Sequence, residues 1–209
     1  DNTIVVFTAD HGDLRGEHHR QNKGVPYEGS AKIPFIIYWP AKIKAGTVID
    51  EALGCVDFLP TIISLMDYET AGKEEGRDAS ALFVDGQAPA DWTDITFVRS
   101  TGDEAGWLAA VTDRHKLIVS TRDDPWLFDL EEDPDELVNR FLDPACREIV
   151  RDLSRQLLDY GKNRKDPRIE NGKIRADLAW AVSGTGAYES SPPADPPARK
   201  ARPKQNKKP

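Results

Sequence analysis

The sequence predicts an α/β fold that ends in a small antiparallel sheet with one helix packed across it. Two short apolar segments come first, at residues 2–8 and 33–39, and one helical stripe follows at residues 56–66. Four short apolar segments separated by turn residues come next, and an amphipathic helix follows at residues 145–160. Buried strands with an intervening helix favour the α/β class, and closely spaced short strands favour a meander.

Residues 2–8 are apolar and rich in β-branched side chains, so we expect a strand buried on both faces, of the kind found in parallel sheets. The strand ends before Gly12, which permits a sharp turn. Residues 33–39 form a second predicted strand, and Pro34 predicts that this strand pairs fully only after its first residues. Both strands are expected to lie in the core of one sheet.

Residues 56–66 carry apolar side chains at helical spacing, with Pro60 in the first turn, where proline is tolerated. Residues 67–94 are polar and are predicted to be mostly loop. The antiparallel meander is then expected to use strands at residues 95–99, 107–111, 116–120 and 126–130. The helix at 145–160 should pack across this small sheet.

These changes of pattern predict four successive regions. The C-terminal part of an α/β domain is followed by a small antiparallel-sheet subdomain with its helix, an irregular extension, and a disordered tail rich in Pro, Lys and Arg. The predicted boundaries are 1–94, 95–165, 166–189 and 190–209. A solvated extension without a specific partner is the simpler expectation for the tail.

Composition narrows the possible functions. The net charge of −8 argues against a general nucleic-acid binder, and any anion site must therefore use local positive groups. No run of about 18 apolar residues is present, so no membrane span is expected. The sequence begins at Asp1 and enters a strand almost at once, which predicts a part of a larger protein. Cys55 and Cys146 match no metal-site spacing; nothing in the sequence supports a disulfide between them, and two buried thiols are the simpler expectation.

Asp10 and His11 directly follow the first predicted strand. Ligands of open α/β sheets bind at the carboxyl ends of strands, and a carboxylate beside an imidazole can hold one divalent cation. An isolated Asp-His pair is more simply explained as a turn cap next to an exposed histidine. However, three of the four histidines of the chain lie at positions 11, 18 and 19, and this clustering favours a site.

Lys23 lies in the same polar loop, beside Gly24. A lysine next to a flexible glycine can present its charge to phosphate or sulfate oxygens. Taken alone, Lys23 would be an ordinary surface lysine. Its interpretation as an anion-binding residue therefore depends on the order of the surrounding motifs.

That order resembles the second half of the formylglycine-dependent sulfatases, which belong to the alkaline-phosphatase superfamily. The specific part of the resemblance is the succession of TADHG at 8–12, RGEH at 15–18, NKG at 22–24 and YEGSAKIPFII at 27–37. WLFDLEEDPDE at 126–136 is similar to a late segment of that family. The resemblance covers roughly residues 1 to 160, and it implies the C-terminal portion of an alkaline-phosphatase-like mixed sheet.

The resemblance implies roles for four residues. Asp10 and His11 would be ligands of one divalent cation, most simply Ca²⁺, and residues 1–94 would belong to the catalytic domain. Lys23, thirteen positions after Asp10, would contact the transferred sulfuryl group. His18 would be a further catalytic or substrate-binding contact, or would support the loop.

The resemblance also implies that the nucleophile lies elsewhere. The family forms its formylglycine from Cys or Ser in a C/S-x-P/A-x-R motif, and neither Cys55 nor Cys146 lies in one. We therefore expect the formylglycine upstream, in a missing N-terminal part of the same protein, and an inactive chain without it. The implied substrate is a sulfated small molecule or carbohydrate, the implied location is periplasmic or secreted, and no nucleic-acid partner is expected.

Two alternatives remain open from the sequence. Phosphonate and phosphodiester hydrolases of the same superfamily carry a similar Asp-His-Gly and lysine arrangement, so the loop alone does not separate sulfuryl from phosphoryl transfer. A non-catalytic, degenerate domain whose basic tail binds an anionic polymer is the other alternative. The retention of Asp10, His11 and Lys23 together argues against the second.

Overall fold

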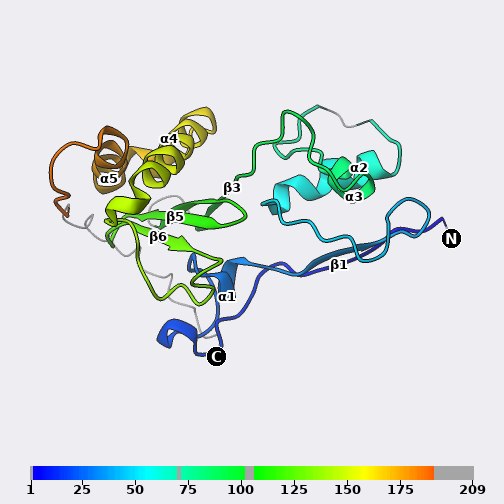
Figure 1. The fold of residues 1–209 in the computed structure, drawn as a ribbon, viewed down its shortest axis with the longest axis horizontal. Coiled ribbons are helices and arrows are strands. Elements are labelled where there is room, and N and C mark those ends of the chain that lie inside the picture. Colours follow the sequence, from blue (N-terminus) through cyan, green and yellow to red (C-terminus); the bar gives the residue numbers. More distant parts are fainter. Residues whose placement is uncertain (1, 70–71, 102–105, 191–209) are drawn as a thin grey trace, which may run out of the picture.

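The computed structural model describes residues 2–69, 72–101 and 106–190. The chain forms two parts that lie side by side (Figure 1). One is a two-stranded ribbon with short helices, and the other is a four-stranded sheet with two longer helices. Except for Ser190, the tail predicted to be disordered lies outside the described residues.

The first part is built on an antiparallel ribbon, in which β1 (Val5–Thr8) pairs with β2 (Phe35–Tyr38). β2 begins directly after Pro34, as the position of the proline predicted. Helices α2 (Phe58–Leu65) and α3 (Ser80–Val84) contribute the aromatic side chains that pack against Phe35 of the ribbon. The helix predicted at residues 56–66 is therefore confirmed.

The other face of the ribbon corrects the expectation of a strand buried on both faces. Val5 stands opposite Tyr38 and Phe7 opposite Ile36, so these four side chains share one face. They are exposed by 52%, 62%, 62% and 58% in the order Val5, Phe7, Tyr38, Ile36. The apolar sequence predicted burial, but β1 has only β2 as a partner and nothing in the described chain covers this face.

The second part is a meander of four antiparallel strands in sequence order, as predicted. Its strands are β3 (Thr96–Arg99), β4 (Trp107–Val111), β5 (His115–Ser120) and β6 (Trp126–Asp129). One face of this sheet forms the main core, whose buried side chains come from the strands and from the two C-terminal helices. The apolar alternation of the strands therefore specifies a face that is filled within the chain.

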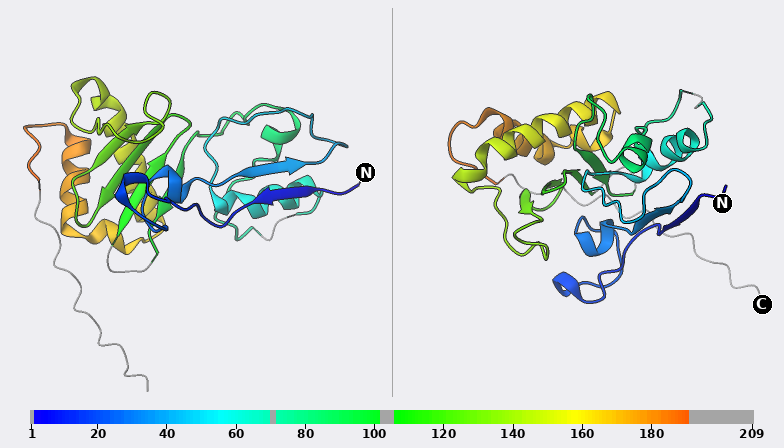
Figure 2. Two further views of the ribbon diagram at one scale, coloured as in Figure 1. Left: turned by 90° about the horizontal axis from the view of Figure 1, so that it is seen from below. Right: turned by 45° about the vertical axis from the view of Figure 1, so that its right-hand side comes forward.

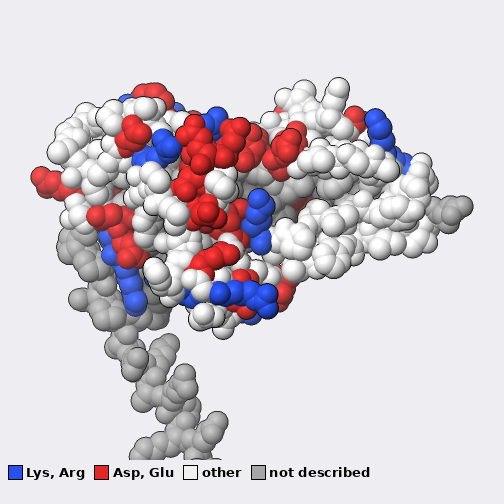
Figure 3. Space-filling model, turned by 60° about the horizontal axis from the view of Figure 1, so that its bottom comes forward, with Lys and Arg blue, Asp and Glu red and all other residues white. Residues whose placement is uncertain are grey.

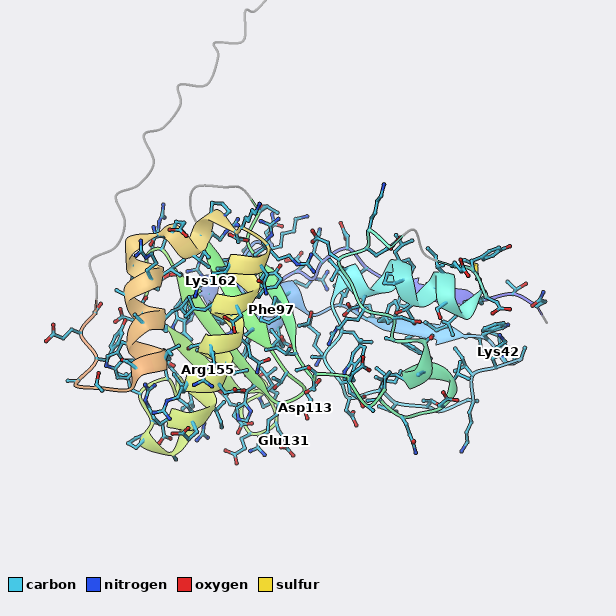
Figure 4. All side chains as sticks on the ribbon, turned by 90° about the horizontal axis from the view of Figure 1, so that it is seen from above. Lys42, Phe97, Asp113, Glu131, Arg155 and Lys162 are labelled. Carbon is cyan, nitrogen blue, oxygen red and sulfur yellow. The ribbon has the colours of Figure 1, made fainter. Side chains whose placement is uncertain are left out.

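Helix α4 (Arg147–Asn163) crosses this face, confirming the predicted helix and its packing. Figure 4 shows Phe97 of the sheet beneath α4, with Arg155 and Lys162 on the outer side of the helix. Phe97 stacks on Tyr160 of α4 with 4.3 Å between ring centroids. Leu157 on the inner side of α4 is completely buried.

The expectation of an irregular extension over residues 166–189 is wrong. This region contains a 3₁₀ helix, η4 (Pro167–Glu170), and a long helix, α5 (Gly172–Ser183), which packs against α4. Asn171 caps α5, its side chain accepting from two backbone amides, and Gly184 ends the helix with φ 69°. The helix was missed because a buried Lys173–Asp177 pair interrupts its apolar stripe.

The segment between β1 and β2 leaves the ribbon and lies against the meander, on the face opposite α4 (Figure 2). It contains the 3₁₀ helix η1 (Glu17–His19) and the short helix α1 (Glu28–Ala31). Tyr27 packs there beside Phe128 of β6. This segment therefore connects the two parts and carries the residues singled out by the sequence.

Both cysteines are free thiols, but only Cys146 is buried, and burial raises the pKa of its thiol. Cys55 is exposed, because it begins the 3₁₀ helix η2 (Cys55–Asp57) at the surface. The expectation of two buried thiols is therefore half wrong. Within the described ranges, no helix is long and apolar enough to cross a membrane.

Candidate functional site

Asp10 and His11 lie just beyond the end of β1, where the chain turns away from the ribbon. The carboxylate Oδ2 of Asp10 lies 3.4 Å from Nε2 of His11, and the Asp10 side chain is 87% exposed. The other ring nitrogen of His11, Nδ1, donates to the carbonyl oxygen of Gly12 at 2.6 Å. A carbonyl only accepts, so Nδ1 carries a proton, and Nε2 is the ring nitrogen that faces Asp10.

Lys23 completes the cluster. Its Nζ lies within hydrogen-bonding distance of His11 Nε2, although twelve residues separate the two in sequence. The structure therefore brings Asp10, His11 and Lys23 together. A carboxylate and an imidazole lone pair can hold a cation, and an ammonium beside them can attract an anion.

His18 lies apart from this cluster, in η1. Its ring stacks on Tyr27 with centroids 3.7 Å apart and an interplanar angle of 10°. Its backbone is left-handed, with φ 50°, which is uncommon for a residue with a side chain. Among the described residues, no hydrogen bond joins His18 to Asp10, His11 or Lys23. The stack and the backbone fix the orientation of the imidazole at the loop surface.

The loop that carries Lys23 is tightly shaped rather than loose. Its left-handed residues include Arg15, His18, His19 and Asn22, and such conformations persist only where surrounding contacts hold them. Asp13 provides two such contacts, because its Oδ1 accepts hydrogen bonds from the backbone amides of Arg15 and Asn22 at 3.2 and 3.1 Å. The exposed residues thus belong to a preorganised loop.

Two glycines allow this loop to approach helix α1 closely. A Cβ at Gly12 would lie 2.1 Å from the carbonyl oxygen of Gly29, and one at Gly29 would lie 2.1 Å from a carboxylate oxygen of Glu17. Ser30 joins both ends of the loop, its carbonyl accepting from Gly12 N at 2.9 Å and its hydroxyl from Gly24 N at 3.1 Å. Any larger side chain at Gly12 would displace the backbone beside His11.

Sequence reasoning missed the side chains that support this loop from the meander. Lys116 of β5 is 1% exposed, and its Nζ contacts Glu28 Oε1 and lies 2.8 Å from Glu136 Oε1. The signal was a lysine directly before the apolar run of residues 117–119 in a strand. A buried charge needs partners, and the two glutamates supply them.

A large cavity of about 1750 Å³ separates the ribbon from the meander. Asp10 and Glu28 lie on its wall, together with Phe97 and Tyr160 from the other side. On the surface, acidic side chains gather over the middle of the molecule, whereas the ribbon end is almost free of charge in the same view (Figure 3).

A complete metal site is not formed by the described residues alone, where no group of three or more His, Cys, Asp or Glu side chains could hold an ion. Asp10 and His11 nevertheless suit a divalent cation as two of its ligands. Carboxylate oxygen is the ligand that Ca²⁺ prefers, and the Nε2 edge of the imidazole lies beside the Asp10 carboxylate. The remaining ligands would have to come from outside the described residues.

Comparison with known proteins gives a consistent result. Residues 16–163 match the family model of the C-terminal region of N-sulphoglucosamine sulphohydrolase. An arylsulfatase of Clostridium perfringens is 32% identical over 177 residues, which are 83% of this chain and 36% of that protein. The chain thus spans about a third of the length of the curated relatives it matches.

Solved structures point to the same fold. A protein in complex with its substrate D-glucosamine-2-N,6-O-disulfate has a TM-score of 0.68 and 29% identity, covering 79% of this chain and 35% of that protein. The phosphonate monoester hydrolase of Silicibacter pomeroyi has a TM-score of 0.66 and 28% identity, covering 80% and 36%. A protein whose substrate is a sulfated sugar and a phosphonate hydrolase therefore share this architecture.

Proposed function

The chain belongs to the sulfatase family represented by the C-terminal region of N-sulphoglucosamine sulphohydrolase, and we propose that it supplies part of the active site of a metal-dependent sulfate-ester hydrolase. The observation that carries the proposal is the meeting of Asp10, His11 and Lys23 just beyond the end of β1. These are the residues whose spacing resembles the sulfatase motif. Their contact was not implied by their separation in sequence.

In the proposed site, Lys23 binds the sulfate group. An ammonium placed at a fixed position stabilises negative charge that develops on the sulfuryl oxygens during ester cleavage. Asp10 and His11 would hold one divalent cation, most simply Ca²⁺. Such a cation, when bound, supplies further positive charge to the same oxygens.

His18 is proposed to contact the substrate beyond the sulfate group. Its stack on Tyr27 orients the ring without using either ring nitrogen, so both stay available for hydrogen bonds to a bound molecule. The nucleophile, a formylglycine, is proposed to come from a part of the protein that precedes these residues.

The apolar face of the ribbon supports the existence of such a further part. Val5, Phe7, Ile36 and Tyr38 together form a contiguous surface that a soluble domain would normally cover. The length of the relatives, about three times that of the residues matched here, provides the material to cover it. We propose that the upstream part packs on this face and brings the nucleophile to Asp10 and Lys23.

We propose a sulfated carbohydrate, and more narrowly a sulfated amino sugar, as the substrate class. The support is the structural neighbour whose substrate is a disulfated glucosamine, together with the matched family model. An exported, periplasmic or secreted protein would meet such substrates. Phosphonate or phosphodiester hydrolysis is the second candidate, because a phosphonate monoester hydrolase is equally similar in structure.

The proposal is tested on the full-length protein purified from its natural source. We expect an intact mass well above 23.3 kDa, an upstream peptide that carries formylglycine, and chelator-sensitive hydrolysis of an aryl sulfate in preference to an aryl phosphonate. Replacement of Lys23 by Ala should lower kcat/KM by about 10²–10³-fold. Lys162→Ala is the control, since this lysine is exposed on α4 (Figure 4).

Three results would change the conclusion. Faster hydrolysis of the phosphonate would favour the second candidate. Equal losses in the Lys23 and Lys162 variants would remove the assigned role of Lys23. A native protein that consists of this chain alone and has no hydrolase activity would favour a non-catalytic, degenerate domain.

A further inference from the structure

The backbone that follows Lys23 is held at every second residue by side chains of the second part. We call Trp107, Lys116 and Glu136 the three-point clamp. Trp107 Nε1 donates to Gly24 O at 3.1 Å, Lys116 Nζ donates to Pro26 O at 3.0 Å, and Glu28 N donates to Glu136 Oε2 at 2.6 Å. The clamp begins one residue after Lys23 and ends at the first residue of α1.

Two members of the clamp, Lys116 and Glu136, are buried charges. Lys116 and Glu136 are 1% and 4% exposed, and their side chains lie 2.8 Å apart. Removing such a pair from water costs free energy that their attraction only partly recovers, so buried ion pairs contribute little net stability. Their hydrogen bonds to the backbone of residues 26 and 28 instead select one arrangement of that segment. This geometry favours positioning over simple stabilisation.

The third member of the clamp, Trp107, acts on Gly24, the residue next to Lys23. Gly24 has φ 95°, and Asn22 on the other side of Lys23 has φ 72°, so the lysine stands between two residues in the left-handed region. Gly24 has many accessible conformations, and a flexible backbone there would let the exposed lysine move away from His11. The indole of Trp107 restrains the Gly24 carbonyl and therefore limits that movement.

We infer that Trp107 is a positioning residue for Lys23, so that the meander sets the location of the sulfate-binding ammonium. Trp107 touches neither Asp10 nor His11 in the hydrogen bonds of the described residues, and its effect passes through Gly24. The inference rests on the proposed function, because Lys23 must bind sulfate for its position to matter. It extends the role of the second part of the molecule from supporting the loop to setting the position of Lys23.

The test compares Trp107→Phe with Trp126→Phe in the full-length protein. Trp126 packs on the same face of the sheet, but its indole nitrogen makes no hydrogen bond to any described residue, so its variant controls for the loss of ring size. Amide hydrogen exchange of residues 22–25 and the nuclear Overhauser effect between the Lys23 side chain and the His11 ring report positioning. Titration with inorganic sulfate, with Lys23→Ala as the reference, reports anion binding.

We expect Trp107→Phe to speed amide hydrogen exchange at residues 22–25 and to weaken the nuclear Overhauser effect between Lys23 and His11. It should lower sulfate affinity by about threefold to tenfold, the range for one lost hydrogen bond. Trp126→Phe should change none of these. Sulfate binding that is lost in Lys23→Ala but equal in both tryptophan variants overturns the positioning inference alone. Absence of sulfate binding to the unmodified full-length protein, or binding unaffected by Lys23→Ala, counts against the proposed role of Lys23 and overturns the inference with it.

Discussion

The two parts of the molecule differ in how completely they bury their apolar side chains. In the meander part, Leu108, Leu117 and Leu157 are fully buried between the sheet and its helices. In the ribbon part, Phe7 and Ile36 remain more than half exposed, although their strands are as apolar as those of the meander. Two regions with similar sequence patterns thus bury their apolar side chains to different extents, and Asp10, His11 and Lys23 lie between them.

The difference shows which region carries its own stability. The main core of the meander, on the face covered by helices, is closed by residues of that part alone. A two-stranded ribbon is marginal in water unless it packs against something further. We interpret the meander part as a unit that folds within this chain, and the ribbon part as a layer completed by residues outside it.

The largest effect is expected from separating the parts. A fragment of residues 95–190 should unfold cooperatively, whereas residues 2–94 alone should show no cooperative transition and should bind a hydrophobic dye. Lys116 would lose Glu28 and Pro26 in the first fragment, but it would also become solvated, so its charge would no longer need them. Calorimetry of both fragments measures this, and a cooperative transition for residues 2–94 would contradict the proposed division at residue 94.

A smaller but still large effect is expected inside the meander core. Leu157→Ala removes a fully buried side chain between α4 and the sheet, and it should lower the free energy of unfolding by about 2–5 kcal/mol. Chemical denaturation monitored by circular dichroism provides the measurement. Leu142→Ala is the matched control, since that leucine is 60% exposed and should change stability little. Similar losses for the two variants would show that this core is not closed.

A moderate effect should appear in acid. Arg114 donates two or more hydrogen bonds to Asp129 and, together with backbone amides, holds the pKa of that buried carboxyl at about 2. Because the folded pKa is lower than the unfolded value of 3.8, the carboxylate stabilises the fold above about pH 4. This contribution, about 1–2 kcal/mol after allowance for the partly exposed arginine, is lost as pH falls toward 2.

The variant Asp129→Asn separates this contribution from general acid unfolding. Its stability should be lower than that of the unmodified protein at pH 7, and the difference should shrink between pH 4 and pH 2. Urea unfolding at a series of pH values measures both. A difference that stays constant over that range would mean that Asp129 does not titrate with a lowered pKa.

Much of the meander was predictable from the sequence because its determinants are local. Alternating apolar residues and turn residues fix β3 to β6, and the apolar stripe fixes α4, since each element finds its partner nearby in the chain. Helix α5 was missed because Lys173 and Asp177 are buried in its face as a pair, which hides the apolar period. The burial of β1 was mispredicted because an apolar, β-branched run predicts a covered strand, whereas among the described residues β1 pairs with β2 alone and one face of the pair stays exposed.

The candidate site shows the same limit. The sequence indicated Asp10, His11 and Lys23 as a set, but it did not imply that Lys23 would fold back onto the His11 ring. That contact depends on the left-handed loop, on Ser30 and on the three-point clamp, whose members lie up to 108 residues away in the chain. Long-range support of this kind leaves only weak traces in one sequence, such as a lysine within an apolar strand.

The smallest change in stability is expected on the apolar face of the ribbon. Substitutions there also test most directly whether the ribbon part is less completely covered than the meander part. Phe7→Thr and Ile36→Thr keep β-branched or strand-favouring side chains while removing exposed apolar surface, so the free energy of unfolding should change by only about 0.5 kcal/mol or less. Binding of a hydrophobic dye should nevertheless fall, because these residues form the exposed patch. In the full-length protein the same substitutions should be costly, by about 1–3 kcal/mol each, if the upstream part covers them. Equal and small effects in both contexts would show that the face is open in the whole protein, and the upstream part would then have to reach Asp10 and Lys23 by another route.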